Sequence, residues 1–61
     1  MSDVADIEVI EFGFGIFVEH HDNMNSYVFY GGRQPKHFFG ETAWMDAERY
    51  AGDKQLEKQY A

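Results

Sequence analysis

The sequence predicts a small α+β domain, in which an antiparallel sheet of three to four strands carries one C-terminal helix. Short segments rich in aromatic and β-branched residues, separated by polar or glycine-containing turns, occupy residues 6–39. This pattern is typical of strands joined by hairpins. From residue 42 onward, alanine and aromatic residues recur at spacings of three and four, which is the helical period. The predicted order is β-β-β-α.

The chain has room for one domain, residues 1–61, because independent domains rarely fall below about 50 residues. It contains no cysteine, which excludes disulfides and thiolate metal sites and fits a reducing compartment. Its apolar runs are shorter than the roughly 18 residues that a membrane span needs, and its first residues lack the basic start of a signal peptide. We therefore expect a cytoplasmic protein that does not enter a membrane.

The first strand is expected at residues 6–12, which begin with Asp6 and Glu8 alternating with β-branched residues. This alternation predicts one wet face that carries both carboxylates. The Gly-Phe-Gly segment at residues 13–15 either bends the strand as a bulge or turns the chain into a separate second strand. The second strand is expected at residues 16–20, and it runs into a polar stretch suited to a turn.

The return strand is expected at residues 27–30, because these residues are apolar on both faces and Gly31-Gly32 follows them. A strand of this kind belongs in a central position. Pro35 has no N–H to donate, so a central strand is excluded around it. Residues 37–39 can still pair briefly at an edge of the sheet as a fourth strand.

The helix is expected to begin after Thr42, a residue type suited to capping the first turn. Gly52 costs a helix interior roughly 1 kcal/mol relative to alanine, so the helix either ends there or weakens before it continues to residue 60. The small residues of its stripe let it lie close to a sheet and leave space for large rings from the strands. The stripe consists of Ala43, Ala47, Tyr50 and Ala51.

Aromatic residues make up 18% of the chain, and each ring can bury on the order of 150 Å². We therefore expect a core built from rings. The six Phe, four Tyr and one Trp are more than one face of a small sheet can cover, so some of them should reach the surface. Exposed Tyr and Trp often anchor protein interfaces, which predicts a homodimer or a different protein partner.

The net charge of −6 lies entirely in the first half of the sequence. Residues 1–32 contain six carboxylates and no Lys or Arg, whereas residues 33–61 contain five acidic and five basic residues. A field of this sign repels nucleic acid and anionic membranes, and it attracts a basic protein surface. Direct binding of nucleic acid is therefore not expected. The same charge also keeps a small protein soluble without any partner.

No metal site is expected from the histidines His20, His21 and His37. Neighbouring strand residues project to opposite faces, so His20 and His21 cannot both reach one metal ion unless the turn has begun there. We place all three in turns and at strand ends, partly exposed. The sequence offers no phosphate-binding loop, and we expect no cofactor.

No catalytic group stands out either. The hydroxyls other than those of tyrosine belong to Ser2, Ser26 and Thr42, and these residues are expected at the terminus, in a turn and at the helix start. Asp6 and Glu8 share a wet face on which nothing is expected to perturb either carboxyl group. The sequence therefore predicts a protein that is not an enzyme.

Three hypotheses of function remain, and we favour a small acidic binding protein that blocks or modulates one macromolecular partner. Proteins of this kind are used by viruses and mobile elements against host enzymes and defence systems, and the expected partner is a nucleic-acid-handling enzyme or complex. The second hypothesis is DNA mimicry, in which carboxylates about 6.7 Å apart on one strand face imitate phosphates. The third is a structural or accessory subunit that forms a homo-oligomer.

The predicted contact residues lie in three places: around the glycine turn, on the helix and on the first strand. They are Tyr27, Tyr30, Arg33 and His37, then Trp44 and Tyr60, then Asp6 and Glu8.

Overall fold

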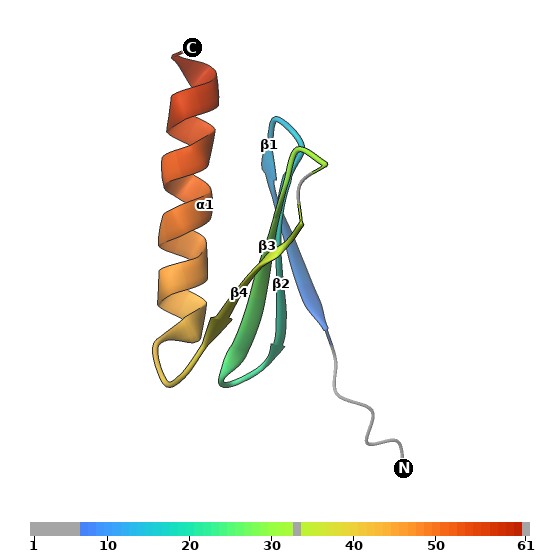
Figure 1. Ribbon diagram of the computed structural model, residues 1–61, viewed down its shortest axis with the longest axis vertical. Coiled ribbons are helices and arrows are strands. Elements are labelled where there is room, and N and C mark those ends of the chain that lie inside the picture. Colours follow the sequence, from blue (N-terminus) through green and yellow to red (C-terminus); the bar gives the residue numbers. More distant parts are fainter. Residues whose placement is uncertain (1–6, 33, 61) are drawn as a thin grey trace.

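The computed structural model describes residues 7–32 and 34–60, which form a four-stranded sheet followed by one helix (Figure 1). In chain order the elements are β1 (Glu8–Gly13), β2 (Ile16–Asp22), β3 (Asn25–Tyr30), β4 (Lys36–Phe39) and α1 (Ala43–Gln59). All strand pairs are antiparallel, and the strands follow one another across the sheet in sequence order. The predicted α+β fold is confirmed, with the segment after Pro35 as a fourth strand at the edge.

Helix α1 packs on one face of the sheet and contacts all four strands (Figure 1). The predicted alanine stripe is buried, since Ala43, Ala47 and Ala51 are at most 1% exposed. Alanine has only a methyl side chain, so the helix approaches the sheet closely and β-branched side chains fill the space between them. The fully buried strand residues of this core are Ile16, Val18 and Val28.

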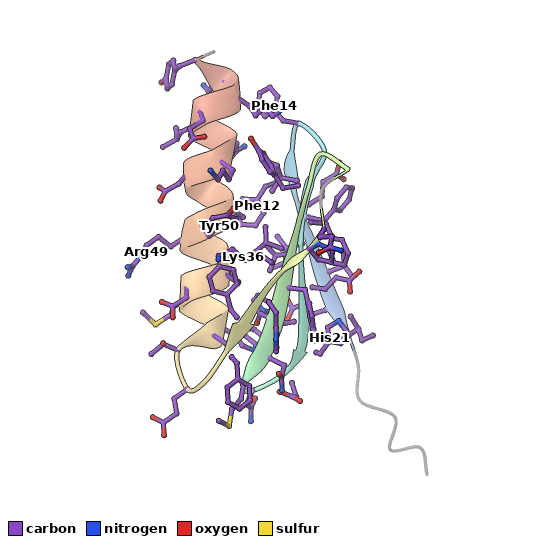
Figure 2. The ribbon with its side chains drawn as sticks, viewed as in Figure 1. Phe12, Phe14, His21, Lys36, Arg49 and Tyr50 are labelled. Carbon is purple, nitrogen blue, oxygen red and sulfur yellow. The ribbon has the colours of Figure 1, made fainter. Side chains whose placement is uncertain are left out.

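The centre of the core is aliphatic, which corrects the expectation of a core built from rings. None of the described Phe, Tyr or Trp residues is fully buried, whereas the β-branched strand residues under the alanines are. Rings border the core instead, as Figure 2 shows for Phe12 and Tyr50. The expectation that some rings reach the surface is confirmed, with Phe39 at 70% and Tyr60 at 78% exposure.

A two-residue turn, Phe14-Gly15, joins β1 to β2. Both residues have positive φ, 57° and 78°, as type I′ hairpins require. The register also shifts between Glu11 and Gly13, so a bulge lies just before the turn. The Gly-Phe-Gly segment therefore contains both structures that the sequence left open, a bulge and a turn into a separate second strand.

The turn between β2 and β3 is shorter than predicted, because the side chain of Asp22 organises it. Its carboxylate accepts hydrogen bonds from the backbone N–H of Met24 at 2.8 Å and from the Asn25 amide at 3.0 Å. These bonds, the one from Met24 above all, hold the pKa of the Asp22 carboxyl below its usual value. β3 consequently begins at Asn25, and Ser26 lies in a strand, which corrects its predicted place in a loop.

The start of α1 is where the sequence predicts it, but the expected side-chain cap is absent. The Thr42 hydroxyl donates to the Asp46 carboxylate at 2.8 Å and makes no hydrogen bond to the backbone of the first turn. Gly52 does not end the helix, which runs on to Gln59. Packing on the sheet stabilises helices more than residue propensity does, so burial of the alanine stripe outweighs the cost of one glycine.

The faces of β1 are the reverse of those suggested by its first residues. Ile10 and Phe12 pack against the core, so Glu8 projects toward the helix side, where it is exposed near the strand end. Val9 projects to the other face and is 54% exposed. Asp6, the other carboxylate of the predicted wet face, lies outside the described residues.

Candidate functional site

The second face of the sheet is covered by no described element, and we call it the open face (Figure 1). Side chains alternate between the two sides of a strand, so the open face consists of the strand residues whose neighbours in the chain point toward α1. They are Val9, Glu11, Phe17, Glu19, His21, Asn25, Tyr27, Phe29, His37 and Phe39. Its composition is mainly aromatic and acidic.

One row of the open face crosses all four strands through directly paired residues. Val9 pairs with Glu19, Glu19 with Tyr27, and Tyr27 with His37. At the usual spacing of about 4.8 Å between strands, this row spans about 14 Å. The rings of Tyr27 and His37 stack, with centroids 4.5 Å apart and planes 11° apart.

Hydrogen bonds fix both histidines of the open face. His21 lies at a register shift in β2, and its Nε2 donates to the Glu19 carboxylate at 3.0 Å. The His37 Nε2 donates to the side-chain oxygen of Asn25 at 2.9 Å. The His21 ring also contacts Tyr27 at a centroid distance of 4.8 Å. The rings are therefore held in place by contacts within the folded chain.

A second row of the open face lies beside the first. Glu11 pairs with Phe17, and Phe17 pairs with Phe29. Phe17 is 37% exposed, and Phe39, at the far end of the open face on β4, is 70% exposed. Aromatic rings on the surface of a folded protein, contiguous and surrounded by polar groups, are typical of an interaction site.

The described cationic side chains all lie away from the open face. The Nζ atom of Lys36 stands 5.6 Å from the Tyr50 ring centre, and that of Lys54 stands 5.3 Å from it, between sheet and helix. Lys58 stands 5.4 Å from the ring of Tyr30. Figure 2 shows Arg49 pointing away from the sheet. The carboxylates Glu11 and Glu19 thus meet no Lys or Arg on their own face within the described chain.

Of the predicted contact residues, the structure brings two together. Tyr27 and His37 are stacked neighbours on the open face. Tyr30 is on the helix side, where Lys54 and Lys58 lie over its ring. Arg33, like Asp6, lies outside the described residues.

The remaining predicted contacts do not join this surface. Trp44 and Tyr60 lie in the first turn and just past the end of a 17-residue helix, which puts them about 24 Å apart. Trp44 packs on the ring of His20 and is 37% exposed, and Tyr60 is 78% exposed. Glu8 is exposed on the helix side of β1.

The open-face residues that sequence reasoning missed are Val9, Glu11, Phe17, Glu19, His21, Asn25, Phe29 and Phe39. Their parity along the strands is visible in the sequence. However, this alternation shows which residues lie on the open face only when the bulges at the ends of β1 and β2 are known. Each bulge reverses the alternation for the residues after it.

A second polar cluster, also missed, is buried between sheet and helix. The Ser26 hydroxyl shares a hydrogen bond with Nδ1 of His20 at 2.7 Å, and Nε2 of His20 donates to the Glu48 carboxylate at 2.8 Å. The His20 side chain has no exposed surface, which corrects its predicted place at an exposed strand end. Trp44 covers the imidazole by stacking on it at 3.9 Å.

The order of groups in this cluster resembles a serine–histidine–acid triad, but the hydroxyl is fully buried. A nucleophilic hydroxyl must reach a substrate carbonyl, and Ser26 is 0% exposed. No pocket opens onto the described residues. The cluster is a fully satisfied hydrogen-bond network that ties α1 to β2 and β3, in agreement with the complete pairing of buried polar side-chain atoms in the described chain.

The three histidines have separate partners, and none of the described residues gathers three potential metal ligands. No helix in the described chain is long and apolar enough to cross a membrane. Comparison with family models, with curated proteins and with solved structures finds no match to this chain.

Proposed function

We propose that this chain is a small acidic binding module, without enzymatic activity, that blocks or modulates one protein partner by docking it on the open face. The observation that carries the proposal is an uncovered sheet face with ordered rings, two carboxylates and no described Lys or Arg. Aromatic side chains are the commonest anchors of protein interfaces.

The charge of the open face favours a basic partner surface. Glu11 and Glu19 stand among apolar side chains, where a partner would displace water and strengthen their attraction to a cation. Enzymes that handle nucleic acid present basic surfaces of this kind, and we propose such an enzyme as the partner class. Nucleic acid itself is disfavoured by the net charge of −6.

A second copy of this chain is the less favourable occupant of the open face. Face-to-face docking of two copies would bring the glutamates of both into one interface with no described Lys or Arg to pair them. Like charges in a desolvated interface oppose association. The homodimer thus stays a prediction, which crosslinking from the open face tests.

DNA mimicry also ranks below partner docking. In the described part of β1, Glu8 and Glu11 project to opposite faces, so the strand offers no row of carboxylates at phosphate-like spacing. Asp3 and Asp6, which such a row would need, lie outside the described residues. Mimicry would require that neutralising all four carboxylates abolish partner binding.

Site-specific photocrosslinking in the native host cells tests the docking face. A photoreactive benzoylphenylalanine replaces Phe39 on the open face or, as the matched control, Met45 on α1, which is 62% exposed. We expect one partner protein to be captured from position 39 and not from position 45. Capture of this chain itself from position 39 would instead identify a homodimer and overturn the proposal.

Affinity measurements on the purified partner complete the test. Phe17→Ala should weaken binding about 30-fold, the effect of losing one interface anchor. Met45→Ala should change the affinity less than about twofold. If the natural protein and both variants bound the partner with equal affinity, or if only Met45→Ala lost affinity, the interface would lie elsewhere. Either result would refute docking on the open face.

A further inference from the structure

The ring of Phe17 lies between two carboxylates on the open face. Glu11 is directly opposite it on β1, at a distance of about 5 Å between Cβ atoms for such a pair. Glu19 follows two residues later on the same side of β2, about 6.7 Å along the strand. One ring therefore has an acidic group toward β1 and another along its own strand.

No other described ring stacks on that of Phe17. Tyr27 and His37 cover each other by stacking, and His21 tilts against Tyr27. Among the described residues no such ring contact involves Phe17, and its side chain is 37% exposed. This is the aromatic ring of the open face that combines an unstacked surface with adjacent negative charge.

Glu19 is held in position yet keeps bonding capacity. One carboxylate oxygen accepts the hydrogen bond from His21, while the described chain offers no donor to the other oxygen. Its side chain is only 31% exposed. Val9 and Tyr27 flank it on the neighbouring strands. A half-buried carboxylate interacts with an incoming cation more strongly than a fully solvated one does.

We propose that the partner docked on the open face contributes an arginine, whose guanidinium lies flat on the Phe17 ring and donates hydrogen bonds to Glu19 and Glu11. This inference rests on the proposed function and names the chemistry of its partner. A planar guanidinium can stack on a ring and direct its N–H groups outward in the same plane, toward carboxylates beside the ring. A lysine ammonium also interacts with a ring face, but it is a compact point charge without a planar surface that can stack, so it fits this arrangement less well.

An NMR titration of the ¹⁵N-labelled protein tests the inference without the natural partner. The probes are three blocked tripeptides, Gly-X-Gly, in which X is arginine, lysine or citrulline. Citrulline keeps the planar shape of arginine and lacks its charge. We expect the arginine peptide to shift the amide resonances of Phe17, Glu19 and Glu11 with a dissociation constant in the millimolar range. The lysine peptide should bind about fivefold more weakly, and the citrulline peptide should produce no saturable shift.

Matched variants identify the groups responsible. Glu19→Gln should weaken the arginine peptide about tenfold, whereas Glu41→Gln, which removes the same charge from an exposed loop, should change its affinity less than twofold. Phe17→Leu should abolish the preference for arginine over lysine because it keeps the bulk and removes the π face. The dispersion of the same spectra reports whether each variant is folded.

The outcomes separate this inference from the proposed function. Equal affinity for the arginine and lysine peptides, or equal losses in Glu19→Gln and Glu41→Gln, would overturn the arginine site. If Phe17→Ala still abolished binding of the crosslinked partner in that case, docking on the open face would stand alone. A third outcome is that the peptides bind as expected while Phe17→Ala leaves the affinity for the partner unchanged. The proposed function would then fail. The arginine inference would fail with it, because it assigns this site to that partner.

Discussion

The indole of Trp44 lies flat on the imidazole of His20, with ring centroids 3.9 Å apart and an angle of 5° between their planes. The indole Nε1 also donates to the backbone carbonyl of Asp22 at 2.8 Å. One side chain from the first turn of α1 therefore seals a buried histidine and joins the helix to the end of β2. Trp44 therefore contributes to the packing of the domain, and its role as a surface anchor stays a prediction.

Replacing this tryptophan should destabilise the fold more than its 37% exposure implies. Trp44→Ala removes the stacked ring and the hydrogen bond to β2 and admits water to His20, so we expect a loss of about 2–3 kcal/mol in unfolding free energy. Urea denaturation measures it. Tyr60→Ala, at a position that is 78% exposed, is the control and should cost less than about 0.5 kcal/mol. Equal losses in the two variants would contradict the packing role.

Removing the hydroxyl beside His20 should be costly for a different reason. Ser26→Ala leaves Nδ1 of His20 buried without a partner, which costs about 1–3 kcal/mol. For a domain of this size, each kcal/mol corresponds to a fall of about 4–8 °C in Tm, which thermal denaturation followed by circular dichroism resolves. Glu48→Gln should cost less, because an amide oxygen can still accept from His20 Nε2 and the Glu48 side chain is 42% exposed.

A double variant checks that the cost arises from the unpaired nitrogen. His20→Leu combined with Ser26→Ala removes both polar partners, and we expect it to be more stable than Ser26→Ala alone, since burying neither partner avoids the desolvation penalty. A double variant that is less stable than Ser26→Ala would show that the histidine ring contributes mainly through its packing against Trp44.

The same substitution at two glycines should have opposite effects. Gly15 has a φ of 78° in the β1–β2 turn, and an added Cβ would meet no atom within 4 Å, so Gly15→Ala incurs only the backbone cost of about 1 kcal/mol. Gly52 lies inside α1, where an added Cβ also meets nothing, so Gly52→Ala should stabilise the protein by about 0.5–1 kcal/mol. Chemical denaturation of both variants measures these shifts. If both substitutions stabilised the protein, the positive φ of Gly15 would be refuted. If both destabilised it, the helical position of Gly52 would be refuted.

Acid should remove the contribution of Asp22. Its folded pKa lies below its usual value, because the carboxylate accepts hydrogen bonds from Met24 and then from Asn25. A depressed pKa in the folded state stabilises it above the unfolded pKa, and this contribution disappears as the pH falls below about 4. Asp22→Asn should therefore be less stable than the natural protein at pH 7, and the difference should shrink toward pH 2. Chemical denaturation between pH 7 and pH 2 measures the difference in unfolding free energy between the two proteins. A difference that did not change with pH would mean that the charge of Asp22 does not contribute to stability.

The elements that the sequence predicted well are those fixed by local patterns. The spacing of Ala43, Ala47 and Ala51 determines which side of the helix is buried, whatever it packs against. The β-branched and aromatic segments indicated the strands, and Pro35 marked the edge. These features depend on residues close together in the chain, so a single sequence contains them.

The elements that the sequence predicted poorly depend on register and on distant contacts. The side chain of Asp22 shortens one turn and thereby carries Ser26 into a strand opposite His20. Glu48 completes that network from 28 positions further along the chain. The composition of the open face likewise requires both bulges to be placed, and a bulge leaves little trace in composition.

The position of α1 after all four strands has a consequence for folding. Every strand pairs with its neighbour in the chain, so the hairpins can form from local contacts before the helix docks. Until the alanines cover Val18 and Val28, however, both faces of the sheet are exposed to water. A folding chain whose sheet has formed but whose helix has not yet packed is therefore the species most prone to aggregation and to capture by chaperones.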